Sequence, residues 1–323
     1  MSKDIRRFSP MQIASQTFKL NNGVLIPAVG FGTWKSTPED AYESVKTALQ
    51  AGYRHIDTAF NYGNEADVGR AIKDSGVLRE DIFLTTKLWS TYHTRVAENL
   101  VLSLERLGVD YIDLYLMHWP VAMNPNGTPP LFPLLPDGTR DLQLDRPFAS
   151  TWRDMEALQH TGKVRAIGVA NFDVHNLEVL RKECTIIPAV NQVELHPYLQ
   201  QKELTKYCDA AGIHVTAYSP LGSGSSELRI ESCITKIAKA HACDPCASIL
   251  AWGVLSRHSV IPKSITPERI KSNFGAGNIA LTAEEVKTIG GLEKGLRYCN
   301  PPWGVVVFVR RYFIPSSHFW KYD

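Results

Sequence analysis

The sequence alternates eight times between a short apolar run and a segment with helical periodicity. The series begins at Ala28–Thr33 and continues to about residue 290. Strand and helix candidates that alternate at a spacing of about 30 residues favour parallel β/α units. The strand candidates are apolar throughout, which is typical of strands buried on both faces. Eight such units in order predict a single (β/α)8 barrel (TIM barrel) of the α/β class rather than an open sheet.

The expected elements follow from these runs and from their flanking caps. The expected strands are Ala28–Thr33, Tyr53–Asp57, Asp81–Lys87, Asp113–His118, Val164–Val169, Ile187–Val193, His214–Ala217 and Val260–Ile261. The expected helices are Pro38–Ala51, Glu65–Lys73, Thr94–Leu107, Ala149–His160, Val174–Glu183, Gln201–Ala211, Glu231–His241 and Pro245–Leu255. Without a break in composition, we expect one domain across residues 1–323, with the barrel at about 28–290 and a C-terminal loop and tail at about 291–323.

Two segments fall outside the β/α series. Thr17–Ile26 predicts an N-terminal β-hairpin with Asn22-Gly23 as its turn, placed to plug the bottom of the barrel. The segment Pro120–Pro147 is rich in proline and is too long for a plain connector. We therefore expect it to be a functional loop at the C-terminal face of the barrel.

Charge and composition exclude several classes of partner. The chain has 35 Lys+Arg against 33 Asp+Glu, a net charge of +2 that offers no basic field for nucleic acid. No apolar run approaches the roughly 18 residues that span a bilayer, so no membrane partner is expected. The six cysteines are irregularly spaced, and the lone pair Cys243 and Cys246 lacks the further ligands of a metal site. The expected location is the cytoplasm, with an N-terminal transit peptide as the alternative.

Polar residues at three successive strand ends suggest the chemistry. Active sites of such barrels lie at the C-terminal ends of the strands, where Asp57, Lys87 and His118 stand, with Tyr62 shortly after Asp57. Each residue alone has a structural explanation, such as a cap or a surface position. Together they suit proton delivery from the phenol to a carbonyl oxygen. In this interpretation the Lys87 ammonium lowers the pKa of Tyr62, Asp57 holds Lys87, and neutral His118 orients the carbonyl.

Six segments of the sequence resemble the aldo-keto reductase family, NADPH-dependent enzymes built on a (β/α)8 barrel. The resemblance covers about residues 17–300. It rests on GYRHIDTAFNYGNEADVG (52–69), TTKLW (85–89), HWP (118–120), NQVELHP (191–197), AYSPLGS (217–223) and IPKSITPERI (261–270). It implies reduction of an aldehyde or ketone to the alcohol, with Asp57, Tyr62, Lys87 and His118 as the catalytic tetrad. It also implies a monomer.

The resemblance further implies a bound NADPH or NADP+ across the barrel mouth. Asn171 and Gln192 would hold the carboxamide, Tyr218 would stack on the nicotinamide, and Lys263 and Arg269 would grip the adenosine 2′-phosphate, a pairing that suits a phosphate. Pro267 can open a helix whose N-terminus adds backbone donors. The full set of implied cofactor-binding residues is Thr33, Trp34, Asn171, Gln192, Tyr218, Ser219, Leu221, Ser223, Lys263, Ser264, Thr266, Arg269 and Asn273.

The substrate is less clearly indicated. Trp34, Trp89 and Trp119 are the expected substrate-binding residues, because ligand pockets are mostly apolar, and Phe132 is equally open to rim packing. The sequence departs from the family pattern at Ala170, at Ser272 and in the tail after Trp303. Two alternatives stay open: a reductase dedicated to one biosynthetic intermediate, and a cofactor-binding scaffold with little turnover.

Overall fold

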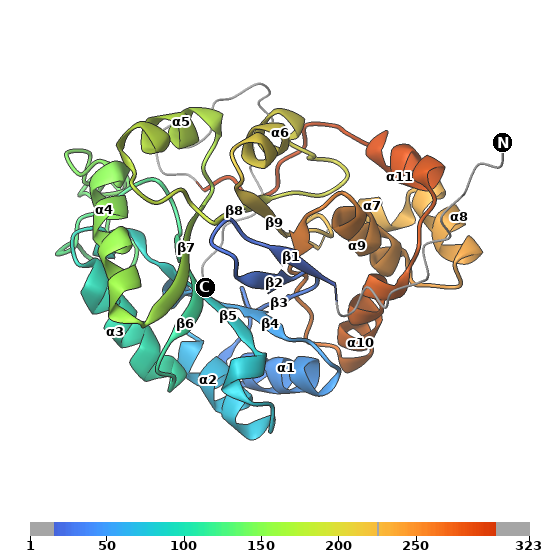
Figure 1. The fold of residues 1–323 in the computed structure, drawn as a ribbon, viewed down its shortest axis with the longest axis horizontal. Coiled ribbons are helices and arrows are strands. Elements are labelled where there is room, and N and C mark those ends of the chain that lie inside the picture. Colours follow the sequence, from blue (N-terminus) through green and yellow to red (C-terminus); the bar gives the residue numbers. More distant parts are fainter. Residues whose placement is uncertain (1–15, 225, 302–323) are drawn as a thin grey trace.

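Eight parallel strands form a closed ring in a computed structural model that describes residues 16–224 and 226–301. They pair in chain order, and the first strand segment returns to the last: Gly30 N donates to Val260 O, and Val260 N donates to Ala28 O, both at 2.8 Å. The predicted (β/α)8 barrel is confirmed (Figure 1). The strands are β3 (Phe31–Gly32), β4 (His55–Asp57), β5 (Phe83–Leu88), β6 (Ile112–Met117), β7 (Val164–Ala170), β8 (Val190–Glu194), β9 (His214–Tyr218) and β10 (Ser259–Val260).

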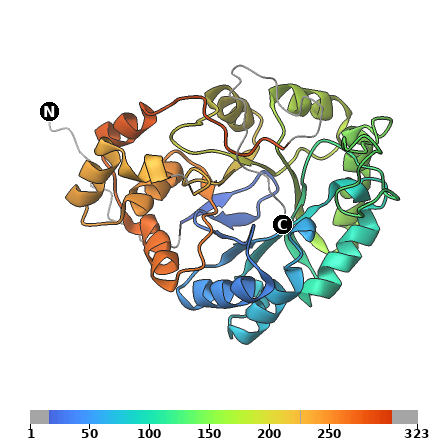
Figure 2. The same ribbon diagram turned by 180° about the vertical axis from the view of Figure 1, so that it is seen from behind.

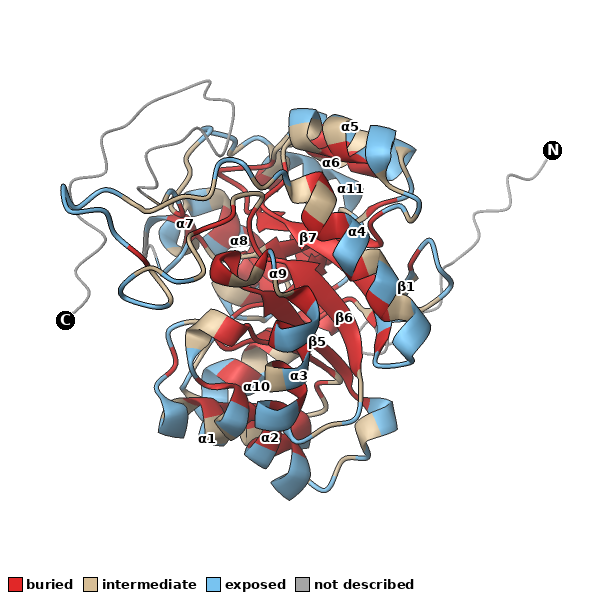
Figure 3. Ribbon diagram, turned by 90° about the vertical axis from the view of Figure 1, so that its left-hand side faces the viewer, coloured by how far each residue is buried: buried red, intermediate tan, exposed pale blue. Residues whose placement is uncertain are grey.

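The helices surround this ring, and most of them bury one face. Strand residues are buried on both faces, whereas most helices are buried toward the strands and exposed outward (Figure 3). Helix α9 differs, because all of its residues from Ala247 to Val254 are buried. Thr37 and Asp244 cap two of the helices by accepting a backbone N–H, and a proline follows each cap. The helices are α1 (Pro38–Gln50), α2 (Glu65–Asp74), α3 (Val96–Leu107), α4 (Phe148–Leu158), α5 (Val174–Glu183), α6 (Lys202–Ala210), α7 (Ser226–Ile230), α8 (Ser232–Ala240), α9 (Pro245–Leu255), α10 (Pro267–Gly275) and α11 (Ala283–Gly290).

The N-terminal hairpin closes the bottom of the barrel. Strands β1 (Thr17–Lys19) and β2 (Leu25–Pro27) pair antiparallel and lie across the centre of the ring in Figures 1 and 2. Leu20 and Ile26 pack against residues at the starts of the barrel strands, such as Phe83. The turn differs from the expected Asn22-Gly23 pair. Leu20 N donates to Val24 O, which leaves a three-residue loop in which Gly23 takes the left-handed conformation (φ 88°).

The segment Pro120–Pro147 folds back on itself without forming a helix. Two isolated antiparallel bridges, Met123 with Leu142 and Leu134 with Arg140, hold it together. It follows β6, so it lies at the C-terminal end of the strands, as predicted. Across 16–224 and 226–301, no helix has the length and apolar character to span a bilayer. The N-terminal residues considered as a transit peptide and the tail after Trp303 lie outside the described residues.

Candidate functional site

Four polar side chains meet at the C-terminal ends of three neighbouring strands. Asp57 ends β4, Lys87 lies in β5, His118 follows β6, and Tyr62 ends the short 3-10 turn after β4. Lys87 Nζ lies 2.6 Å from Asp57 Oδ1 and 3.3 Å from Tyr62 Oη. The rings of Tyr62 and His118 are 5.7 Å apart between centroids and meet edge to face. The structure thus brings together the four residues predicted from the strand ends.

The Asp57–Lys87 ion pair is fully enclosed and hydrogen-bonded on both sides. Lys87 Nζ also donates to Thr58 O at 2.8 Å, and Gln192 Nε2 donates to Asp57 Oδ2 at 2.6 Å. Burial lowers the pKa of Lys87, and the neighbouring Asp57 carboxylate opposes this by favouring the ammonium. A buried ion pair persists only with such additional hydrogen bonds. The pair therefore fixes a positive charge beside the Tyr62 hydroxyl.

The pKa of Tyr62 differs from the expectation based on Lys87 alone. Burial raises the pKa of the Tyr62 phenol well above its usual value, and the charges of Asp57 and Cys299 add to this effect. The expected lowering of that pKa is wrong for this structure, because burial of the phenol is the largest influence on it. Burial, reinforced by Lys87, also lowers the pKa of His118 well below its usual value. At neutral pH the phenol therefore keeps its proton and the imidazole is uncharged.

Two amide side chains connect this group to the next strands of the barrel. Asn171, which follows β7 in the left-handed conformation (φ 63°), donates from Nδ2 to His118 O at 2.9 Å. Its Oδ1 accepts a hydrogen bond from Tyr218 Oη at 2.8 Å. Gln192 in β8 binds Asp57, as described above. The residues expected to hold a carboxamide thus also orient the backbone and side chains of the tetrad.

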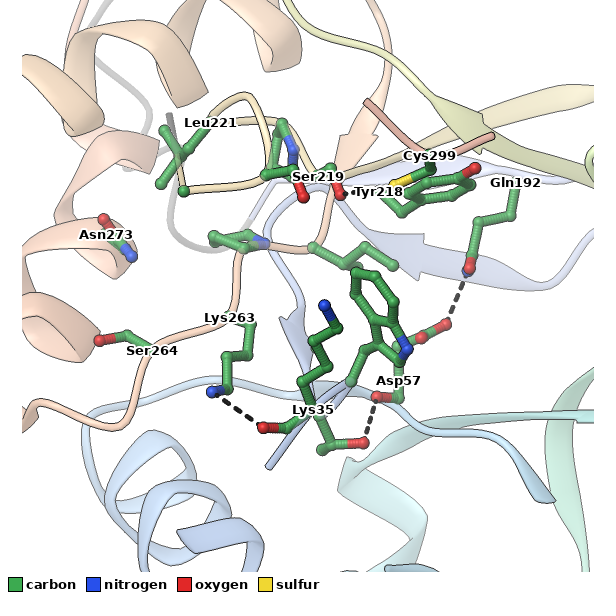
Figure 4. Close-up of a pocket in the computed structure, with 18 of the residues that line it drawn as sticks. Lys35, Asp57, Gln192, Tyr218, Ser219, Leu221, Lys263, Ser264, Asn273 and Cys299 are labelled. Carbon is green, nitrogen blue, oxygen red and sulfur yellow. Dashed lines mark hydrogen bonds between the residues drawn. The ribbon is translucent and has the colours of Figure 1, made fainter. Parts of the chain in front are cut away.

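Asp57, Tyr62 and His118 of the tetrad line a cavity of about 1150 Å³ at the barrel mouth. This volume slightly exceeds the roughly 300–1,000 Å³ of common small-molecule sites. Figure 4 shows Asp57 hydrogen-bonded to Gln192 in the wall of this cavity. Two of the predicted site residues do not line the cavity. Lys87 lies behind the lining residues Asp57 and Tyr62, and the backbone N–H of Thr266 donates to Oγ of the lining residue Ser264. The predicted residues that line it are Thr33, Trp34, Asp57, Tyr62, Trp89, His118, Trp119, Asn171, Gln192, Tyr218, Ser219, Leu221, Ser223, Lys263, Ser264, Arg269 and Asn273.

One arm of the cavity is rich in cations. Lys263 and Ser264 precede α10, which begins at Pro267 as predicted, and Arg269 lies in its first turn. Figure 4 shows Lys263 beside Lys35, whose carbonyl oxygen accepts from Lys263 Nζ at 3.5 Å. Burial lowers the pKa of Lys263, and Lys35 adds to the effect. Cations close to a helix N-terminus form a site suited to a phosphate group.

A second arm of the cavity is aromatic. Trp89, Trp119 and Phe132 line the cavity, and Trp89 Nε1 donates to Leu131 O at 2.6 Å. The Trp89 ring lies 5.3 Å from that of His118 and 5.1 Å from that of Phe132. The loop after β6 therefore completes an apolar wall that begins at the tetrad, and Phe132 belongs to this wall.

Sequence reasoning missed several residues of the site. Lys35, Asn61, Arg140 and Arg229 also line the cavity, and Arg229 lies in the unpredicted helix α7. Lys35 follows Trp34 directly and Asn61 lies within the motif at 52–69, so both had a local signal. Arg140 lies in a loop and Arg229 in a short helix, both without a recognisable pattern. In the described part of the chain, no three His, Cys, Asp or Glu side chains group in a way that would hold a metal ion.

Glu194, the last residue of β8, is the most deeply buried of the missed residues. Its two carboxylate oxygens accept from Tyr298 N at 2.7 Å and from Cys299 N at 2.8 Å. His196 Nε2 lies 3.0 Å from Oε1. Cys299 lines the cavity, so this carboxylate fixes the C-terminal loop against the site. The motif NQVELHP contains Glu194, but its partners lie about a hundred residues later in the chain.

We expect the substitution Glu194→Gln to destabilise the protein by about 1–3 kcal/mol, because one backbone N–H of the loop loses its acceptor in a buried place. Urea denaturation measures this loss. The exposed Glu178→Gln is the control, with an expected change within about 0.5 kcal/mol. Equal stability of the two variants would show that Glu194 does not hold the loop.

A family model described as the aldo/keto reductase family matches residues 28–294. The chain belongs to this family. The match spans all eight strands of the barrel, together with the tetrad and both arms of the cavity. This aldo/keto reductase is accordingly an oxidoreductase that acts on carbonyl groups.

Individual relatives agree with this assignment. The aldo/keto reductase is 45% identical to a D-galacturonate reductase of Hypocrea jecorina over 303 residues, which is 91% of this chain and 97% of the relative. It is 45% identical to a glycerol 2-dehydrogenase (NADP(+)) of Saccharomyces cerevisiae, over 90% of this chain and 96% of the relative. A solved aldose reductase of Schistosoma japonicum superimposes with a TM-score of 0.83 at 36% identity, covering 87% of this chain and 93% of that one.

Proposed function

We propose that this aldo/keto reductase reduces an aldehyde or ketone to the alcohol with NADPH, and that Tyr62 supplies the proton. The observation that carries the proposal is the group Asp57–Lys87–Tyr62. A protonated phenol lies 3.3 Å from an ammonium that a buried carboxylate fixes in place. The group lies in the wall of a cavity with a cationic arm for a cofactor and an aromatic arm for a substrate.

The residues of the cavity fit an NADPH molecule. The cationic arm offers Lys263, Arg269 and the N-terminus of α10 to a phosphate group, while Asn171 and Gln192 stand near the tetrad with amides suited to a carboxamide. Tyr218 lines the wall beside Asn171, where a planar ring can stack. These residues would hold the cofactor, which when bound supplies the hydride.

The protein's own part in the reaction is orientation and proton transfer. Trp89, Trp119 and Phe132 exclude water from the substrate arm, and neutral His118 orients the carbonyl by a hydrogen bond. Tyr62 Oη donates its proton to the carbonyl oxygen as negative charge develops there. The ammonium of Lys87 stabilises the phenolate that remains, and Asp57 keeps Lys87 charged and in place. The balance is one hydride and one proton added across the C=O bond.

The cations at and just before the N-terminal end of α10 favour NADPH over NADH. We expect Lys263→Met to raise the Kd for NADPH by about ten- to a hundredfold and to leave the Kd for NADH nearly unchanged, because a charge-assisted hydrogen bond contributes about 1.5–3 kcal/mol. Fluorescence titration with both cofactors measures the two Kd values. The exposed Lys236→Met on α8 is the control. A Lys263→Met variant that keeps its preference for NADPH would refute the assignment of the 2′-phosphate site.

Two alternatives differ from a general reductase in their measurable behaviour. A cofactor-binding scaffold would bind NADPH but would not oxidise it, whichever carbonyl compound is added. Such a scaffold has no need of the complete tetrad seen here. A reductase dedicated to one intermediate would oxidise NADPH with a narrow group of substrates. Turnover across sugars, short aldehydes and bulky ketones separates these cases. The names of the relatives include both an acidic and a neutral polyhydroxylated compound, so they leave the charge of the substrate open.

A further inference from the structure

The aromatic arm of the cavity ends at a cation, Arg140. This residue belongs to the segment Pro120–Pro147, where it forms an isolated antiparallel bridge with Leu134. Its guanidinium donates from one NH group to Phe132 O and lies 5.4 Å from the centroid of the Phe132 ring. Arg140 is half-buried and lines the cavity. The loop thus holds the planar cation in a defined place beside the last ring of the aromatic wall.

The wall leads from the tetrad to Arg140 without interruption. The ring of His118 contacts that of Trp89 at 5.3 Å, Trp89 contacts Phe132 at 5.1 Å, and Phe132 contacts the guanidinium. A substrate whose carbonyl lies at Tyr62 and His118 therefore extends along two aromatic side chains before it meets Arg140.

Position distinguishes Arg140 from the cations of the cofactor arm. Among the described lining residues, the other cations are Lys35, Arg229, Lys263 and Arg269. They come from the loop after β3, from α7 and from the segment around α10, while Arg140 alone comes from the loop that forms the aromatic wall. A guanidinium stays charged at any physiological pH and matches the two oxygens of a carboxylate with two parallel N–H groups. Apolar walls strengthen this attraction because they lower the local dielectric constant.

We propose that Arg140 binds the carboxylate of the substrate, so that the preferred substrates are elongated aldehydes with an acid group at the far end from the carbonyl, such as the open-chain form of a six-carbon uronate. The proposal rests on the proposed function, since it names the substrate class of the same site. The aldehyde carbon lies at the tetrad, and the carboxylate forms charge-assisted hydrogen bonds with the guanidinium. The aromatic rings contact the atoms between them.

A matched pair of substrates tests the charge directly. 4-Carboxybenzaldehyde and methyl 4-formylbenzoate share the reacting group and the ring, and they differ in charge at the far end. For the wild-type enzyme we expect a kcat/KM for the acid about ten- to a hundredfold above that for the ester, and we expect Arg140→Gln to remove this difference through KM with kcat nearly unchanged. Arg140→Lys, which keeps the charge and loses the planar fork, should retain part of the preference. Arg153→Gln on the exposed face of α4 is the control.

Three outcomes would overturn the proposal. The first is a wild-type kcat/KM for the ester as high as that for the acid. The second is an Arg140→Gln variant in which kcat/KM changes equally for both substrates. The third is an Arg153→Gln variant with the same effect as Arg140→Gln. Equal losses would mean that Arg140 only supports the loop through Phe132 O. The second readout is calorimetric titration of 4-(hydroxymethyl)benzoate and its methyl ester, which requires no turnover. Selective binding of the acid that depends on Arg140 supports the proposal even if NADPH is not oxidised, whereas absence of turnover with every aldehyde overturns the proposed function.

Discussion

We expect the substitution Tyr62→Phe to lower kcat by about 10²–10⁴-fold, the usual contribution of a positioned general acid, and to leave the Kd for NADPH close to that of the wild type. The hydroxyl that lies 3.3 Å from Lys87 Nζ is the only atom removed, and the ring and the walls of the cavity remain. Steady-state oxidation of NADPH with an aldehyde gives kcat, and a fluorescence titration gives the Kd.

The control for this variant is Tyr207→Phe on α6. Tyr207 accepts a surface hydrogen bond from Arg181 and lies outside the cavity lining, so its loss should leave kcat unchanged within twofold. A Tyr62→Phe variant with wild-type kcat would show that another group supplies the proton. A variant with equal losses in kcat and in NADPH affinity would show that the hydroxyl serves the structure of the site rather than proton transfer.

We expect the substitution Asp57→Ala to destabilise the protein by about 3–5 kcal/mol, because it leaves the Lys87 ammonium buried without its counter-ion. Asp57 is also the partner of Gln192 Nε2, which loses its acceptor. Burial already lowers the pKa of Lys87, and removal of the carboxylate removes the main opposing influence. Lys87 would therefore tend to lose its proton in this variant. Urea denaturation at neutral pH measures the free energy of unfolding.

A double variant separates the ion pair from a general packing defect. When Lys87→Met is added to Asp57→Ala, no charge stays buried, and we expect part of the lost stability to return. We expect neither Asp57→Ala nor the double variant to oxidise NADPH with a carbonyl substrate. A double variant that is as unstable as the sum of the two single variants, or an Asp57→Ala variant within about 1 kcal/mol of the wild type, would contradict the role given to the pair.

The barrel was predictable because its strand and helix signals are local. Helices such as Val174–Glu183 and Pro245–Leu255 begin and end where their caps and prolines indicate. Failures occur where the signal is short or lies outside the β/α series. Two helices were missed. Helix α7 has only five residues, and α11 lies after the last β/α unit. The capping box of α11, Thr282 with Glu285, was nevertheless visible in the sequence. The expected hairpin turn, Asn22-Gly23, is one residue shorter than the loop observed, in which left-handed Gly23 is the third residue.

The tetrad was predictable for a related reason. Parallel strands bring their C-terminal ends together, so polar residues at the ends of neighbouring strands must meet. The pKa of Tyr62 was not predictable, because its direction depends on how deeply the fold buries the phenol. Arg140 and Glu194 escaped for a further reason. The first lies in a loop without periodicity, and the second gains its meaning from backbone groups of Tyr298 and Cys299 far along the chain.

The most direct test of the central claim is a stoichiometric assay with the wild-type protein. NADPH oxidation and alcohol formation are followed together with a panel of aldehydes, ketones and sugar acids, and NADPH binding is titrated in parallel. The account predicts one alcohol formed for each NADPH oxidised with at least the acidic aromatic aldehyde, at an enzyme that binds NADPH. Two results would contradict this account: the protein binds NADPH but does not oxidise it with any member of the panel, or the protein does not bind NADPH.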